Sequence, residues 1–186
     1  WRRIYLDRRR LLDFPEYIEI ETIGACNARC IICPNSEIRK NHSDKPALLN
    51  SEIYKKLIDE ISAYKVKCIA LFSQNEPLLD NRITDFIRYA KEKCPGAKIA
   101  LNTNVSLLNE NIAGLILKSG LDHITFSIHG WTSETMKKVS GLSFEKVLSN
   151  AVHFLEKAAA ANSGIEIGLN CLKTVYFTKE DYDAAF

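Results

Sequence analysis

The sequence predicts an α/β fold built around a parallel β-sheet. Five short runs rich in Ile, Val, Phe or Thr have the composition and length of strands. A helical pattern follows each run, so strand and helix alternate five times along the 186 residues. The predicted strands are YIEIETI (17–23), KCIALFS (67–73), KIALNTN (98–104), HITFSIH (123–129) and IEIGLNC (165–171).

The predicted strands differ in polarity. Those at 67–73, 98–104 and 123–129 are apolar on both faces at their centres, which is typical of parallel strands covered by helices. The strand at 17–23 alternates Ile with Glu and Thr, so one of its faces is more polar. Right-handed crossovers bring the carboxyl ends of the strands to one edge, where α/β proteins bind ligands. A doubly wound sheet and a barrel both satisfy this pattern.

Apolar residues at helical spacing predict the intervening helices. The first helix has Asn50 or Ser51 as its candidate N-cap. Its predicted apolar face consists of Ile53, Leu57, Ile58 and Ile61. The predicted helices are SEIYKKLIDEIS (51–62), NRITDFIRYAKEKC (81–94), NENIAGLILKSG (109–120), SFEKVLSNAVHFLEKAAAAN (143–162) and TKEDYDAAF (178–186).

Composition predicts one ordinary globular domain. The chain is 46% hydrophobic and 26% charged, with a net charge of only +2, which gives no reason to expect nucleic acid or an anionic membrane as partner. No apolar run approaches the length of a membrane span. Five arginines make residues 1–16 a basic lead-in segment before a core domain at 17–186: Arg2, Arg3, Arg8, Arg9 and Arg10. Because the chain opens with Trp1 and stops in a helix-like segment, we expect a fragment.

Three cysteines crowd the segment IGACNARCIICPN (23–35), directly after the first predicted strand: Cys26, Cys30 and Cys33. The other three cysteines are scattered singly, which is not the pattern of a disulfide framework. A reducing, cytoplasmic compartment with metal-bound thiolates fits better. A shared helical face would also explain spacings of four and three, but Gly24 and Pro34 argue against a regular helix.

Two metal sites are compatible with three thiolates. A zinc site needs a fourth ligand, for which His42 is the nearest candidate. A four-iron cluster held by three thiolates leaves one iron open to a substrate or cofactor.

The segment CNARCIIC (26–33) resembles the CxxxCxΦC motif of the radical S-adenosylmethionine (SAM) superfamily, with Ile32 at the apolar position. The resemblance implies a 4Fe–4S cluster on Cys26, Cys30 and Cys33, with SAM chelating the open iron. It implies reductive cleavage of SAM to a 5′-deoxyadenosyl radical, which abstracts hydrogen from a substrate. An electron donor such as flavodoxin or ferredoxin is implied as a partner.

Later segments resemble further motifs of this family. SQNEPLL (73–79) resembles the GGEP motif beside the methionyl amino group: Glu76 and Pro77 match, whereas Gln74 and Asn75 replace the glycines. A carboxylate there could accept from an ammonium group. LNTNVSLL (101–108) is similar to the TNG segment at Thr103 and Asn104, but Val105 stands where glycine is usual.

Two more segments complete the resemblance. FSIHG (126–130) matches an SxDG-like segment at Ser127, with His129 in the aspartate position, either as a loop histidine or as a proton carrier. The segment IGLN (167–170) places Asn170 where the family often has a polar residue near the adenosine of SAM. The cofactor-binding residues implied are Ile32, Asn75, Glu76, Pro77, Asn102, Thr103, Asn104, Ser127 and Asn170.

The resemblance implies a partial (βα)6 TIM-like barrel with outer helices, whose sixth strand lies beyond Phe186. The opening segment resembles the SPASM/twitch branch, which adds auxiliary clusters in a C-terminal extension. The implied substrate is a peptide or a small molecule. The alternative is a non-catalytic zinc-binding or iron–sulfur scaffold for protein interaction, which the replaced glycines at Asn75 and Val105 keep open.

Overall fold

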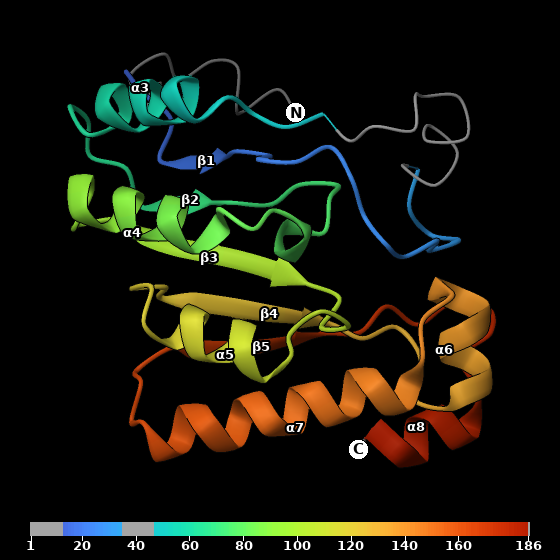
Figure 1. The fold of residues 1–186 in the computed structure, drawn as a ribbon. Helices are drawn as coiled ribbons and strands as arrows, with labels where there is room; N and C mark the ends of the chain where they lie inside the picture. The colour runs from blue at the N-terminus through green and yellow to red at the C-terminus, as the bar shows by residue number, and fades with distance from the viewer. Residues whose placement is uncertain (1–12, 35–46, 186) are drawn as a thin grey trace, which may run out of the picture.

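The computed structural model describes residues 13–34 and 47–185, and the structural statements below refer to them. Five parallel strands form one sheet in the order β1-β2-β3-β4-β5 (Figure 1). The strands are β1 (Tyr17–Glu19), β2 (Cys68–Ala70), β3 (Lys98–Thr103), β4 (His123–Ser127) and β5 (Glu166–Asn170). The helices are α3 (Ser51–Ile61), the 3-10 turn η3 (Pro77–Leu79), α4 (Ile83–Lys93), α5 (Glu110–Leu117), α6 (Ser133–Ser140), α7 (Phe144–Ala160) and α8 (Lys179–Ala185). The predicted α/β fold with a parallel sheet is confirmed.

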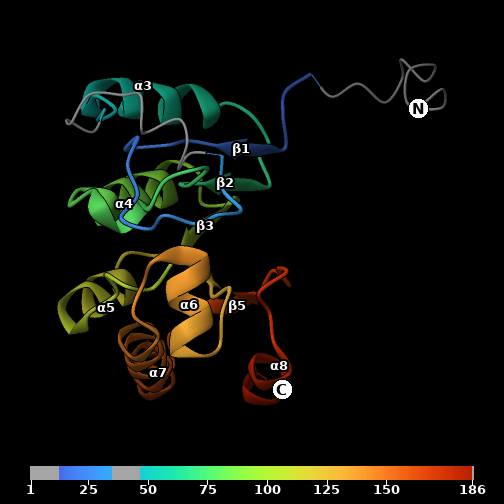
Figure 2. The same cartoon turned by 90° about the vertical axis from the view of Figure 1, so that its right-hand side faces the viewer.

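Helices α3, α4, α5 and α7 lie on one side of the sheet, whereas α6 lies at the end to which the strands point (Figures 1 and 2). The helix-facing side chains of the strands form the core, among them Ile69, Leu71, Ile99, Leu101, Ile124 and Phe126. The alternate positions on the other face carry small or polar residues, such as Ala100, Asn102 and Thr125. This one-sided cover is consistent with part of a TIM-like barrel.

The buried face of helix α3 matches the predicted one only in part: Ile58 and Ile61 are buried as predicted, whereas Ile53 and Leu57 are exposed. Asn50 caps it as expected, because its side-chain oxygen accepts from the Glu52 amide at 2.8 Å. Tyr54 is fully buried; it stacks on Phe86 and donates a 2.8 Å hydrogen bond to the Phe86 carbonyl. Ile53 is 53% exposed, so its predicted place in the core is wrong.

Helix α6 was not predicted. Its sequence, SETMKKVS, has too few apolar residues to show a clear period, although Thr132 caps its start and Gly141 ends it in the left-handed conformation. The sheet ladder of the first strand is also shorter than predicted, because the chain turns away after Ile20 and forms a bridge between Ile23 and Leu48. No helix in the described part of the chain is long and apolar enough to cross a membrane. The arginines of the lead-in segment lie outside the described residues.

Candidate functional site

The three crowded cysteines lie on the loop that leaves β1 at the carboxyl edge of the sheet. This loop is not helical, so the shared-helix interpretation is wrong. The Cys33 amide donates to the Cys30 carbonyl at 3.1 Å, which makes a tight turn with Ile31 and Ile32 exposed at its corner. Cys26, Cys30 and Cys33 are half-buried, and none of the six cysteines, all in described segments, forms a disulfide.

Backbone hydrogen bonds fix this loop against other elements. The amides of Arg29 and Ile31 donate to the carbonyls of Ser140 and Val139, at 2.8 and 2.9 Å. These carbonyls belong to the last turn of α6, where backbone carbonyls have no hydrogen-bond donor within the helix. On the other side, the Glu76 amide donates to the Ala25 carbonyl at 2.8 Å. The loop is therefore held between α6 and the start of η3.

The thiols are close enough to influence each other. Burial raises the pKa of Cys30 to about 11, and repulsion from Cys26 and Cys33 adds to the shift. Within residues 13–34 and 47–185, no three His, Cys, Asp or Glu side chains are grouped as ligands of a single metal ion. An iron–sulfur cluster spaces its thiolates more widely than a single ion does. His42, the candidate fourth zinc ligand, lies outside these residues.

Two N–H groups point at the sulfur of Cys26. The Ala28 amide lies 3.4 Å from it and the Asn104 side-chain Nδ2 lies 3.8 Å from it. Hydrogen bonds of this kind surround the thiolate ligands of iron–sulfur clusters and tune them. Three neighbouring thiols with donors aimed at one sulfur therefore fit a cluster chemically.

Glu76 caps η3, in the segment after β2, and ties this segment to the end of β3. Its carboxylate is 1% exposed and accepts from Thr103 Oγ1 at 2.8 Å, from the Asn104 amide at 2.7 Å and from the Leu78 amide at 3.1 Å. Burial raises its pKa to about 7, although these three donors act in the opposite direction. Pro77 follows as the first residue of η3 and is buried. Glu76 and Thr103 thus face the protein interior and support the edge of the sheet.

The turn that contains Asn75 lies beside this carboxylate. Asn75 Oδ1 accepts from the Ser73 amide, and the Gln74 amide donates to Glu21 Oε1, both at 3.1 Å. The Asn75 Nδ2 atom is buried and has no hydrogen-bond partner among the described residues. A buried donor of this kind is costly unless a ligand completes it.

Val105 has a backbone conformation that usually requires glycine. Its φ is 67°, in the left-handed region that a β-branched residue rarely adopts. Thr103 Oγ1 accepts from its amide at 3.0 Å, and Asn150 Nδ2 on α7 donates to its carbonyl at 2.9 Å. The fully buried Val105 side chain also packs in the core. These contacts hold the turn in a strained conformation.

Asn102, Ser127 and Asn170 share the polar face of the sheet. The register pairs Asn102 with Thr125 and Ser127 with Asn170. Because alternate residues of a strand share a face, these side chains lie on the side away from the helices, toward the carboxyl edge. The structure thus brings Asn102, Ser127 and Asn170 to one face of the sheet, near its carboxyl edge.

His129 lies just beyond β4, also on this edge. Its Nδ1 accepts from the Leu172 amide at 3.2 Å, which leaves the proton of the neutral ring on Nε2. Burial lowers the pKa of His129, so the neutral form is favoured. Its proposed role as a proton carrier remains a prediction.

The sequence-based prediction missed Asn27, Ser106 and Asn150. Asn27 and Ser106 hydrogen-bond each other and Asn104, and both lie within or next to the predicted motifs, so a search for polar neighbours of those motifs would have found them. Asn150 lies within α7, where no sequence signal marks it.

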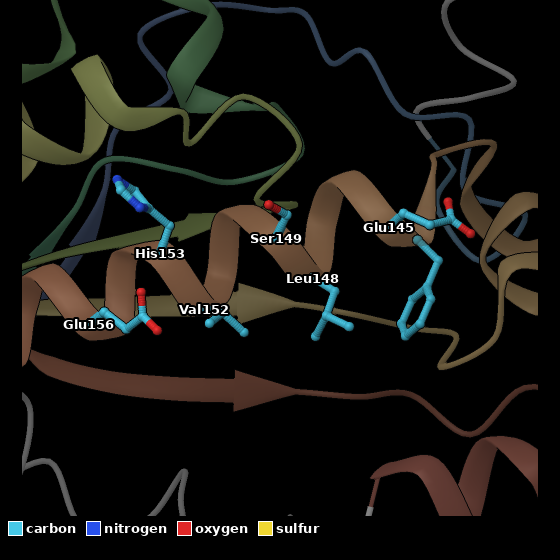
Figure 3. A pocket seen from close by; sticks show the side chains of 7 residues that line it. Glu145, Leu148, Ser149, Val152, His153 and Glu156 are labelled. Atoms are coloured by element: carbon cyan, nitrogen blue, oxygen red, sulfur yellow. The ribbon is translucent and has the colours of Figure 1, made fainter.

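A shallow groove of about 500 Å³ lies along α7 (Figure 3). None of the predicted site residues lines it. Its lining residues are Phe144, Glu145, Leu148, Ser149, Val152, His153 and Glu156. This groove therefore belongs to the helical layer and not to the carboxyl edge of the sheet.

Comparison with known proteins gives consistent matches. Residues 20–173 match the family described as the Radical SAM superfamily. The chain is 29% identical over 151 residues to the AdoMet-dependent heme synthase of Methanosarcina barkeri, covering 80% of this chain and 41% of that protein.

Two solved structures share the fold. SuiB of Streptococcus suis, bound to its precursor peptide SuiA, superposes with a TM-score of 0.74 at 17% identity, covering 94% of this chain and 36% of SuiB. BtrN in complex with AdoMet and 2-DOIA gives a TM-score of 0.66 at 20% identity, covering 87% of this chain and 58% of BtrN. The chain therefore spans less than half the length of the heme synthase and of SuiB.

Proposed function

The chain belongs to the radical SAM superfamily, whose enzymes bind a 4Fe–4S cluster and SAM, and on this premise we propose that Cys26, Cys30 and Cys33 hold the cluster. The observation that carries the proposal is the arrangement of three half-buried thiols on one fixed loop, with N–H donors at Cys26. When bound, the cluster and SAM supply one-electron chemistry that leads to hydrogen abstraction from a substrate.

The polar face next to the loop is the proposed binding surface for SAM. Asn102, Ser127 and Asn170 offer side-chain donors and acceptors to the carboxylate, ribose and adenine of SAM. The buried Nδ2 of Asn75 offers one more donor. Ile32, at the corner of the cysteine turn, supplies apolar cover for the cluster.

Four further predicted residues act mainly by supporting this surface. Both carboxylate oxygens of Glu76 accept hydrogen bonds from the protein, so its proposed role is to hold the turn at 73–76 against β3. Thr103 and Asn104 are its partners, and Pro77 starts the turn that follows. The charge of Glu76 near the proposed site of the methionyl ammonium favours a cation there.

Replacing any one of Cys26, Cys30 and Cys33 by Ala tests this function. We expect anaerobically reconstituted protein to contain iron and sulfide, to show a cluster EPR signal that changes on adding SAM, and to cleave SAM. Each of the three variants should lose SAM cleavage completely, because a cluster with two thiolates is not held in place. Cys68→Ala is the matched control, since Cys68 is half-buried in β2, at the start of the strand.

Two results would contradict the proposal: SAM cleavage retained in any of the three variants, or stoichiometric zinc without sulfide in the wild-type protein. The second result would support the zinc-binding scaffold, for which replacement of His42 would then be the next test.

The remaining features of the activity are proposed from the resemblance and from composition. We propose a core domain at 17–186 behind a basic lead-in segment at 1–16, within a larger SPASM/twitch-type protein. The structures that share this fold include one bound to a peptide and one bound to a small molecule, so both substrate classes stand, with a slight preference for peptides. A reducing cytoplasmic compartment and a flavodoxin or ferredoxin as electron donor complete the proposal.

A further inference from the structure

The Asn104 side chain lies between the turn after β3 and the cysteine loop. Its Nδ2 donates to Asn27 Oδ1 at 2.9 Å and to Cys26 Sγ at 3.8 Å. Its Oδ1 accepts from the Ser106 amide at 3.0 Å and from the Ser106 hydroxyl at 2.6 Å. Because Ser106 places two donors at the oxygen, the amide cannot be reversed, and the nitrogen must face the sulfur.

Three side chains close this arrangement into a ring. Asn27 Nδ2 donates to Ser106 Oγ at 2.8 Å, so the Ser106 hydroxyl proton is committed to Asn104 Oδ1. The two Nδ2 protons of Asn104 then serve Asn27 and Cys26. Asn104 and Ser106 are 9% and 4% exposed, so a rotation that broke the ring would leave buried polar groups unpaired.

The ring is also fixed to the sheet. The Asn104 backbone amide donates to Glu76 Oε2 at 2.7 Å, and Asn150 holds the carbonyls of Val105 and Ser106 at 2.9 and 3.2 Å. The Asn104 amide is therefore in position before any ligand binds. Such a preorganised dipole acts on a nearby charge without having to reorient.

We propose that Asn104 is a positioning residue for the cluster, whose side-chain N–H stabilises the negative charge on the Cys26 sulfur and thereby raises the reduction potential of the cluster. Reduction adds an electron to the cluster and increases the charge on its sulfur ligands, so an N–H donor stabilises the reduced form more than the oxidised form. The inference rests on the proposed function, because it requires a cluster on Cys26.

The test is the midpoint potential of the reconstituted full chain, measured by EPR-monitored redox titration without SAM. Asn104→Ala removes the donor, so we expect a shift to more negative potential. Asn104→Asp keeps an acceptor for Ser106 but places a negative group at the sulfur, so its shift should be larger in the same direction. Asn111→Ala, which removes an exposed amide on α5, should leave the potential unchanged.

Ser106→Ala provides a second route to the same answer. It removes the hydroxyl that fixes Asn104 Oδ1, so the potential should shift in the negative direction by less than in Asn104→Ala. If the Asn104 variants do not load a cluster, the Ser106 variant decides. Asn104→Ala with a full cluster and the wild-type potential overturns the inference. The same result in Ser106→Ala overturns it when only that variant binds a cluster. Either result leaves the proposed function intact. Absence of a cluster from the wild-type protein would overturn the proposed function itself.

Discussion

The carboxylate of Glu76 is a single buried group that joins the start of η3 to the end of β3. It accepts three hydrogen bonds from residues of η3 and β3 and its neighbour, yet burial still raises its pKa to about 7. In the unfolded chain the same group titrates near 4.5. Because its pKa is higher in the folded state, Glu76 binds a proton more tightly there than in the unfolded chain. The contribution of Glu76 to the unfolding free energy is therefore lost as the pH rises from 4.5 through 7.

Glu76→Gln should remove this pH dependence. Between pH 4.5 and pH 8, the unfolding free energy of wild type should fall by about 3 kcal/mol relative to that of the variant. The measurement is denaturant unfolding of the reduced, iron-free protein across this range. Glu60→Gln, at an exposed site on α3, is the control and should give a curve parallel to wild type. Parallel curves for Glu76→Gln would show that the carboxylate does not titrate in this window.

The motifs of the proposed site can be recognised in the sequence, but the contacts between them cannot. The pattern CNARCIIC and the pair Glu76–Pro77 can be recognised along the chain, whereas the contact between Asn104 and Cys26 joins residues 78 positions apart. The amide orientation of Asn104 depends on Ser106, two residues along the chain, and on Asn27, which is 77 positions away and cannot be found from the local sequence.

At the scale of elements, strands were predicted better than helix faces. All five strands were found from their composition, the more exposed β1 and β5 as well as the three buried ones between them. A helix face depends on which residue finds a partner: Tyr54 is buried because Phe86 offers both a ring and a carbonyl, and this turns Ile53 toward solvent. Helix α6 was missed because it is stabilised by caps and by the cysteine loop more than by its own apolar period.

Gly130 shows how closely α6 is packed against the end of β4. A Cβ atom at this position would lie 2.6 Å from the backbone nitrogen of Met136, closer than real contacts allow. Gly130→Ala should therefore displace α6 and cost about 1–3 kcal/mol of unfolding free energy. Because the carbonyls of Val139 and Ser140 hold the cysteine loop, the variant should also bind less iron and sulfide on reconstitution.

Gly96→Ala is the matched control for this substitution. No atom lies within 4 Å of a Cβ built at Gly96, and its backbone φ is not in the left-handed region. Thermal unfolding and iron content should both stay at wild-type values. Normal cluster loading in a Gly130→Ala protein of reduced stability would mean that α6 does not position the cysteine loop.

At the scale of the whole molecule, hydrogen bonds connect the cysteine loop near the start of the chain to α8 near its end. The loop amides bind the last turn of α6, and the first turn of α6 contacts Asp181 of α8 through the Thr135 hydroxyl at 2.8 Å. The Asp181 carboxylate also accepts from the Trp131 amide at 2.7 Å and the Thr178 amide at 2.9 Å. Asp181 and Thr135 are buried, whereas Trp131 is half-buried and Thr178 is exposed.

Asp181→Ala should therefore weaken the molecule at a distance from the sheet. The substitution leaves the buried Thr135 hydroxyl and the part-buried Trp131 amide without their acceptor, for an expected cost of about 1–3 kcal/mol, and frees the first turn of α6. Burial alone would raise the pKa of Asp181, but its hydrogen-bond donors outweigh burial and lower it below 3.8. Its stabilising effect is thus complete above pH 3.8 and is lost as the pH falls through the lower, folded-state value. Wild type and variant should consequently approach each other in stability only under acidic conditions.

The control is Asp183→Ala on the same helix, where an exposed carboxylate pairs with Lys179 and contributes little. Denaturant unfolding at pH 7 and at pH 3 measures the stability difference for both variants. Hydrogen exchange of the Arg29 and Ile31 amides reports the effect on the cysteine loop, because both amides donate to α6. Faster exchange of these two amides in Asp181→Ala, but not in Asp183→Ala, is expected if α6 transmits the loss. Unchanged exchange in both variants would mean that the loop is held independently of α8.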